Sequence, residues 1–203
     1  MRREWLWLGA AVMAFAIGAS CAETYARLAA PYYATVAARI ADSRPWRILD
    51  VAVVHDDASH GPVLRLTSEV SQHRGDVHPA ALVDSSVQVG EVVETPLVFW
   101  TLLLFWPAQT LRQRGLRLFI GIPVFLGLET ATTVCQLLHP LAEASALLAG
   151  ESHPVTVWER WSRFLEAGGR FVLEVAAALI PVALTSKVRS DRHNLTASPV
   201  RAV

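Results

Sequence analysis

Two apolar runs occupy residues 92–138, which read VVETPLVFWTLLLFWPAQTLRQRGLRLFIGIPVFLGLETATTVCQLL. The runs cover residues 92–111 and 118–138, and three arginines lie between them: Arg112, Arg114 and Arg117. A bilayer core needs about 20 mostly apolar residues per helical span, and clustered Lys and Arg stay on the cytoplasmic side. The stretch therefore predicts two spans joined by a short basic turn on the inside.

Outward from this hairpin, residues 5–22 and 171–186 form two more apolar stretches. Basic residues lie just before the first and just after the second: Arg2, Arg3, Lys187, Arg189 and Arg192. The positive clusters thus alternate from side to side. We expect about four transmembrane helices in a bacterial inner membrane, with both termini cytoplasmic. Residues 23–94 and 139–170 would then be extracytoplasmic.

Composition agrees with this topology. Only 18% of the residues are charged and 53% are hydrophobic, whereas a soluble domain carries about a quarter charged residues. Residues 23–94 hold six Arg against ten Asp or Glu. No dense basic surface is available for phosphates, so nucleic acid is not an expected partner. The expected partners are membrane lipids and a membrane protein.

The N-terminal stretch, residues 1–22, is interpreted as a retained transmembrane anchor. Ser20-Cys21-Ala22 before Glu23 also fits a cleaved signal peptide and, more weakly, a lipoprotein signal. Small residues recur at every fourth position across this site and onward to Ala38, beginning with Ala10, Ala14, Gly18 and Ala22. Such a ridge lets helices approach closely in a membrane, although an alanine-rich helix also produces it by chance. We expect it to be a helix-packing ridge.

Residues 23–45 are predicted to continue as a helical stalk, kinked at Pro31. Residues 46–94 are predicted to form a small β-rich outer segment. Leu64 and Leu66 alternate with Arg65 and Thr67, which is the period of a strand with one buried face. A similar alternation follows from Ala81 onward, and the apolar run 48–54 suits a buried strand. A three-stranded meander is the simplest arrangement.

Residues 95–188 are predicted to form a three-helix membrane region. Gly121, Pro123 and Gly127 predict local irregularity in its second helix. At about residues 155–167 an amphipathic helix with two tryptophans is expected to lie in the headgroup plane, followed by a bend at Gly168-Gly169. Residues 189–203 are expected to be a disordered cytoplasmic tail. The predicted fold is an α-helical integral membrane protein with a small β-rich extracytoplasmic insertion.

Carboxylates inside a predicted span are the sharpest functional candidates, because a buried charge there is costly. Glu129, Thr133 and Gln136 share one helix face and predict an intramembrane polar seam. This seam would either accept protons or bind a partner, or it would hold helices together by hydrogen bonds. Glu174 lies four residues after Arg170 and is expected to pair with it.

Other reactive side chains are less informative. The histidines His55, His60, His73 and His78 flank two different turns and do not converge on one metal site. Cys135 and His139 share a helix face without a third group to orient them. Cys21 and Cys135 could form a disulfide or remain two small apolar side chains. We expect no catalytic residues, no metal and no cofactor.

Three segments resemble the exosortase-H-associated membrane proteins of bacteria. They are Glu94-Thr95-Pro96-Leu97-Val98, Leu118-Phe119-Ile120-Gly121-Ile122, and residues 171–187 with Pro181. The similarity covers mainly residues 92–188. It implies a non-enzymatic accessory to an exosortase-type protein-sorting or envelope-assembly system. The alternative is a small membrane-embedded enzyme or transporter subunit that uses Glu129.

Overall fold

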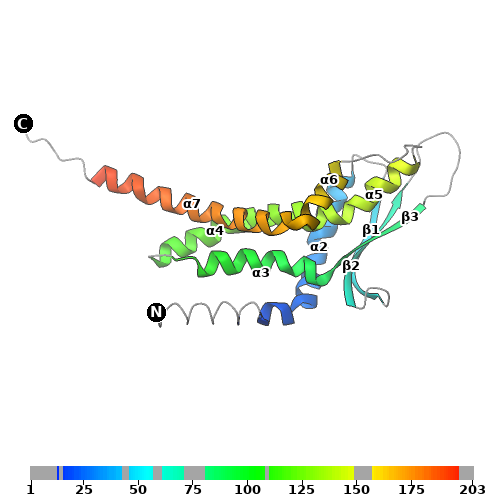
Figure 1. Ribbon diagram of the computed structural model, residues 1–203, viewed down its shortest axis with the longest axis horizontal. Coiled ribbons are helices and arrows are strands. Elements are labelled where there is room, and N and C mark those ends of the chain that lie inside the picture. The colour runs from blue at the N-terminus through cyan, green and yellow to red at the C-terminus, as the bar shows by residue number, and fades with distance from the viewer. Residues whose placement is uncertain are drawn as a thin grey trace, which may run out of the picture.

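The computed structural model describes Met13 and residues 16–42, 46–56, 61–70, 81–107, 110–148 and 157–196. Within these residues the protein is mostly helical and carries one three-stranded sheet. Three helices pack on one another as a bundle, namely α3 (Val89–Phe105), α4 (Leu111–Glu129) and α7 (Arg170–Thr196). The sheet lies at one end of this bundle, and the turn between α3 and α4 lies at the other (Figure 1).

Two helical stretches, Leu111–Leu147 and Val157–Ser186, are long and apolar enough to cross a membrane. These are fewer than the four spans expected. Of the other two, α3 has 17 residues, and residues 1–12 of the predicted anchor lie outside the described part of the chain. Two of the helices thus have the length and composition that a membrane protein requires.

The third predicted span, residues 118–138, is one part of a longer helix. α4 begins after Thr110, whose side chain accepts a hydrogen bond from the Gln113 N–H at 3.2 Å. It passes without interruption through a π-helical turn, η1 (Thr130–Val134), into α5 (Cys135–Leu148). The irregularity expected near Gly121 and Pro123 thus occurs later, in a run of β-branched residues, which are poor helix formers.

The predicted stalk is helix α2 (Ala22–Ala41), which continues through Pro31. It does not prolong the preceding helix in a straight line, because the chain turns at Cys21 and α2 then crosses the end of the bundle (Figure 1). Its buried small residues are Ala26, Ala30, Ala37 and Ala41. A strict spacing of four drifts around a helix of 3.6 residues per turn, so Ala34 and Ala38 are only partly buried.

The sheet is the expected meander, with strands β1 (Trp46–Asp56), β2 (Gly61–Val70) and β3 (Ala81–Gln88) in antiparallel order β1-β2-β3. Leu64, Leu66, Ser85 and Val87 are buried on the face that packs on α2 and α5. Arg65, Thr67, Asp84 and Ser86 occupy the opposite face. The predicted alternation is confirmed in both strands.

Two details of this region differ from expectation. β1 is an edge strand, and an irregularity between Ile48 and Asp50 leaves the Leu49 side chain exposed. The run 48–54 is therefore less buried than its composition suggested. The β-rich range 46–94 also ends early, because α3 begins at Val89 and residues 89–94 are its first turns.

The predicted amphipathic helix is present as α6 (Val157–Phe164), followed by a π-helical turn, η2 (Leu165–Gly169). Gly168 adopts a φ of 93°, which favours glycine, and makes the predicted bend into α7. α7 continues to Thr196, so residues 189–196 are helical and the expectation of a disordered tail from residue 189 was wrong for them. No proline or glycine occurs between Val182 and Thr196 to end the helix earlier.

Candidate functional site

A group of mostly buried polar side chains lies where the three-helix bundle meets the layer formed by α2, the sheet and α6. We call it the polar junction and define it as Tyr25, Tyr33, Thr95, Glu129, Gln136, Arg170 and Glu174. Its members come from α2, α3, the α4–α5 helix and α7. Glu129 and Glu174, both singled out from the sequence, are 1% and 0% exposed.

Glu129 ends α4 and is surrounded by hydroxyl groups. The Tyr33 hydroxyl donates to its Oε2 at 2.6 Å, and the Tyr25 hydroxyl donates to its Oε1 at 3.2 Å. Thr133, one helical turn along, adds a longer contact of 3.5 Å. Glu129 and Thr133 therefore do lie together as predicted, and the carboxylate is satisfied by donors from another helix.

The tyrosines come from one face of α2, because Tyr25 and Tyr33 are two helical turns apart. Burial raises the pKa of both hydroxyls above the ordinary value, and the nearby Glu129 charge raises the pKa of each further. Both side chains consequently remain neutral hydrogen-bond donors. The spacing of these tyrosines was visible in the sequence, but nothing local connected it with Glu129.

The π-helical turn is held by side chains from two other helices. The Tyr32 hydroxyl donates to the Leu126 carbonyl at 2.8 Å and lies 2.7 Å from the Thr130 hydroxyl. From α6, the Trp161 indole N–H donates to the Ala131 carbonyl at 2.6 Å. The Trp161 side chain thus points into the protein and bonds a backbone carbonyl there, although α6 was expected to present its tryptophans to the headgroup plane.

Arg170 is nearly buried and reaches away from its own helix. Its guanidinium donates to the Gln136 side-chain oxygen and to the Glu91 backbone carbonyl. It also lies 3.7 Å from the Glu91 carboxylate. The expected pairing of Arg170 with Glu174 is therefore replaced by contacts with α3 and α5. Gln136 likewise leaves the predicted seam, because the π-helical turn changes the helix register and the arginine binds it.

Glu174 has a different environment from Glu129. It accepts one hydrogen bond, from the Thr95 hydroxyl to Oε1 at 2.9 Å. Its second oxygen, Oε2, is buried without a hydrogen-bond partner among the described residues. A buried polar atom without a partner is rare in proteins.

Arg117 lies at the other end of the bundle and belongs to α4, although the sequence placed it in the short basic turn between two predicted spans. It is 4% exposed. Its guanidinium donates to the carbonyls of Trp106 and Pro107 at 3.3 and 3.0 Å, and to the Thr185 hydroxyl at 3.1 Å. Arg117 therefore caps the end of α3 and binds α7 to it.

The predicted packing ridge is partly visible. A side chain added at Gly18 would meet the Leu97 side chain of α3 at 2.0 Å, so the helix backbone approaches α3 closely there. Ala22 is partly buried beside the same region. Ala10 and Ala14 lie outside the described residues.

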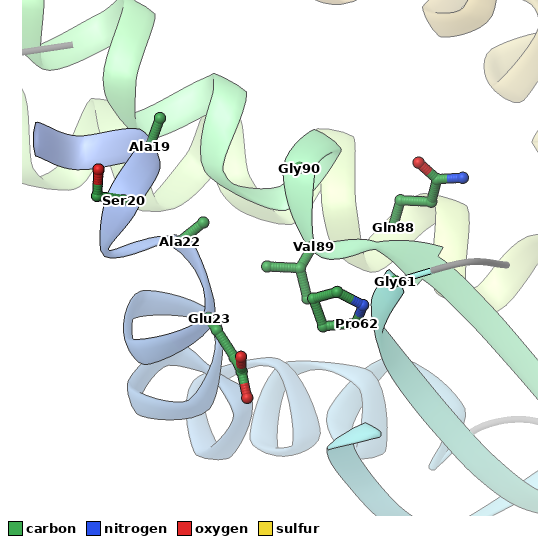
Figure 2. Close-up of a pocket in the computed structure, with 9 residues that line it drawn as sticks. All are labelled: Ala19, Ser20, Ala22, Glu23, Gly61, Pro62, Gln88, Val89 and Gly90. Carbon is green, nitrogen blue, oxygen red and sulfur yellow. The ribbon is translucent and has the colours of Figure 1, made fainter. Parts of the chain in front are cut away.

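A cavity of about 340 Å³ opens beside this contact, between the turn at Cys21 and the starts of β2 and α3 (Figure 2). Its lining consists mainly of small residues, and Glu23 is the one ionisable side chain in it. Glu23 also pairs with Arg27 and lies 3.9 Å from the His55 imidazole. The hydroxyl among these lining residues is that of Ser20, which donates to the Ala16 carbonyl at 2.9 Å.

Within the described part of the chain, no group of three or more His, Cys, Asp or Glu side chains is placed to hold a metal ion. His55 is described, whereas His60, His73 and His78 lie outside it. Both Cys21 and Cys135 are free thiols. The polar junction can therefore fix helices and hold protons or hydrogen bonds, but it offers no evident nucleophile–base pair.

No protein-family model matches the chain, and neither the curated proteins nor the solved structures contain a significant match.

Proposed function

We propose that this chain is a non-enzymatic accessory protein of the bacterial inner membrane that holds a small outer sheet for a membrane-protein partner. The observation that best supports a non-enzymatic role is that the Glu129 carboxyl is buried and accepts hydrogen bonds from two tyrosine hydroxyls of α2. A proton carrier or catalytic acid needs access to water or substrate. Glu129 instead serves to fasten the outer layer to the bundle.

The proposed topology has about four spans, with both termini cytoplasmic and residues 23–94 and 139–170 outside. The sheet and α5 lie at the end of the bundle opposite the α3–α4 turn, which carries exposed Arg112 and Arg114 (Figure 1). Exposed arginines at one end and the sheet at the other agree with cytoplasmic retention of positive charge. α3 adds 17 mostly apolar residues, within the range of a span.

The outward face of the sheet is the proposed contact for the partner. Asp84, Ser86 and Gln88 are exposed there, beside the exposed apolar side chain of Leu82. The resemblance of residues 92–188 to exosortase-H-associated proteins suggests a membrane sorting transpeptidase as that partner. Lipids would surround the bundle itself.

A photo-crosslinking amino acid at position 86, incorporated in cells that contain the sorting enzyme, tests this contact. We expect a crosslinked product that contains that enzyme. The matched control is position 119 in α4, where Phe119 is 72% exposed on the bundle and lipid should dominate. Absence of the enzyme from the position 86 product would rule out this face as its docking surface.

The alternative function, an enzyme or transporter subunit that uses Glu129, is tested by Glu129→Gln. The amide keeps an oxygen that can accept from Tyr33 but cannot exchange protons. We expect the variant to lower thermal stability and to retain the cellular phenotype of the protein. Loss of that phenotype in a protein that still accumulates and folds would favour the alternative.

A further inference from the structure

We infer that Glu174 is held as a neutral carboxylic acid, so that the polar junction stores one proton between α3 and α7. This assignment concerns the bundle itself and does not depend on the identity of the partner.

The hydrogen bonds around Glu174 suit a neutral acid and not a carboxylate. An ionised carboxylate has about four acceptor positions on its two oxygens, and a buried charge normally needs several donors or a counter-ion. Glu174 is fully buried and receives one donor, the Thr95 hydroxyl, on Oε1. Oε2 has no donor among the described residues. Glu129, by contrast, has three hydroxyls directed at it.

The charges around Glu174 also favour the neutral acid. Arg170 is the cation near Glu174, but its guanidinium is committed to Gln136 and Glu91. α3 contributes two further carboxylates on this side, the exposed Glu91 and Glu94, and Glu94 repels a negative charge on Glu174. Glu129 on α4 shares the same arginine. One arginine therefore faces several carboxylates, and a second fully buried negative charge would be left without compensation.

The neutral acid resolves both features. Its carbonyl oxygen, Oε1, accepts a hydrogen bond from the Thr95 hydroxyl. Its other oxygen, Oε2, carries a proton that comes from solvent. A neutral polar group without a partner is far less costly to bury than an ion. Loss of this proton would place two carboxylate-bearing helices, α3 and α7, in repulsion at the point where they meet.

Infrared spectroscopy of the purified full-length protein tests the assignment, because a protonated carboxyl absorbs separately from a carboxylate. We expect such a band at neutral pH, its loss in Glu174→Gln, and its retention in the matched variant Glu129→Gln. Glu174→Asp should shift the band, which keeps the test valid where the glutamine variant does not fold. A band that is absent from the wild type, or that disappears in Glu129→Gln and persists in Glu174→Gln, would overturn the inference.

A pH titration of thermal stability provides a second measurement. Wild-type protein should lose stability as the pH rises and Glu174 ionises, whereas Glu174→Gln should show a smaller loss. Glu94→Gln removes the negative charge that repels an ionised Glu174, so its loss should be smaller than in the wild type but larger than in Glu174→Gln. Equal pH dependence in wild type and Glu174→Gln would show that no proton is released from this site.

Discussion

Tyr33 is the side chain on which the attachment of α2 to the bundle depends most. Its hydroxyl is fully buried and makes the shortest hydrogen bond to Glu129, at 2.6 Å. Removing the donor leaves a buried carboxylate oxygen with one weak contact, from Thr133. Tyr25, at 3.2 Å from the other oxygen, is the weaker partner.

We expect Tyr33→Phe to lower the free energy of unfolding by about 2 kcal/mol, the usual value of a hydrogen bond to a charged group. Tyr25→Phe should cost less because its bond is longer. Thermal or denaturant unfolding in detergent provides the measurement. A smaller effect for Tyr33→Phe than for Tyr25→Phe would contradict the geometry.

The same tyrosines predict a loss of stability in alkali. Their pKa values in the folded protein are raised above the ordinary value of 10.0, mainly by burial. Their protonated form therefore contributes stability that is fully present below pH 10.0 and is lost as the pH rises further. Unfolding curves above that pH should show the loss, and Tyr33→Phe should reduce its slope. An unchanged slope would mean that Tyr33 does not titrate on unfolding.

At the scale of an element, the π-helical turn η1 is the part of the long helix that most needs support from outside. Tyr32 of α2 bonds the Leu126 carbonyl just before the turn and contacts the Thr130 hydroxyl within it, and Trp161 of α6 bonds the Ala131 carbonyl. Interruptions of the regular helical ladder occur where other groups satisfy the backbone. The turn therefore links the two outer helices through one short segment.

We expect Trp161→Phe to loosen α6, because the Ala131 carbonyl loses its indole donor while the aromatic contact with Phe164 can remain. Hydrogen exchange should accelerate in residues 157–164 and stay unchanged in the sheet. Val157→Ala is the control, since Val157 is 82% exposed. Equal protection of α6 in Trp161→Phe and wild type would show that this bond does not hold the helix.

Elements of this protein were predictable where a local pattern repeats. The alternation around Leu64 and Leu66 predicted β2 and its buried face, and the glycine pair predicted the bend before α7. The partners of Glu129 were not predictable, because they lie 96 and 104 residues away in the chain. Arg170 shows the same limit: a local rule assigned it to Glu174, and tertiary packing assigned it to Gln136.

At the scale of the whole molecule, the proposed orientation can be measured directly. In a background without Cys21 and Cys135, Ser86→Cys on the sheet and Leu111→Cys at the α3–α4 turn occupy opposite ends of the bundle (Figure 1). A membrane-impermeant thiol reagent added to spheroplasts should label position 86 and not position 111, where the leucine is 86% exposed. The reverse pattern would invert the topology.

The unbroken helix from α4 to α5 has a mechanical consequence. At about 1.5 Å per residue, its 38 residues, Leu111–Leu148, form a rod about 57 Å long, whereas the hydrocarbon core of a bilayer is about 30 Å thick. α5 also contacts β3. In the proposed membrane orientation, a change of bilayer thickness that tilts α4 would therefore also move α5 and displace the sheet that α5 contacts.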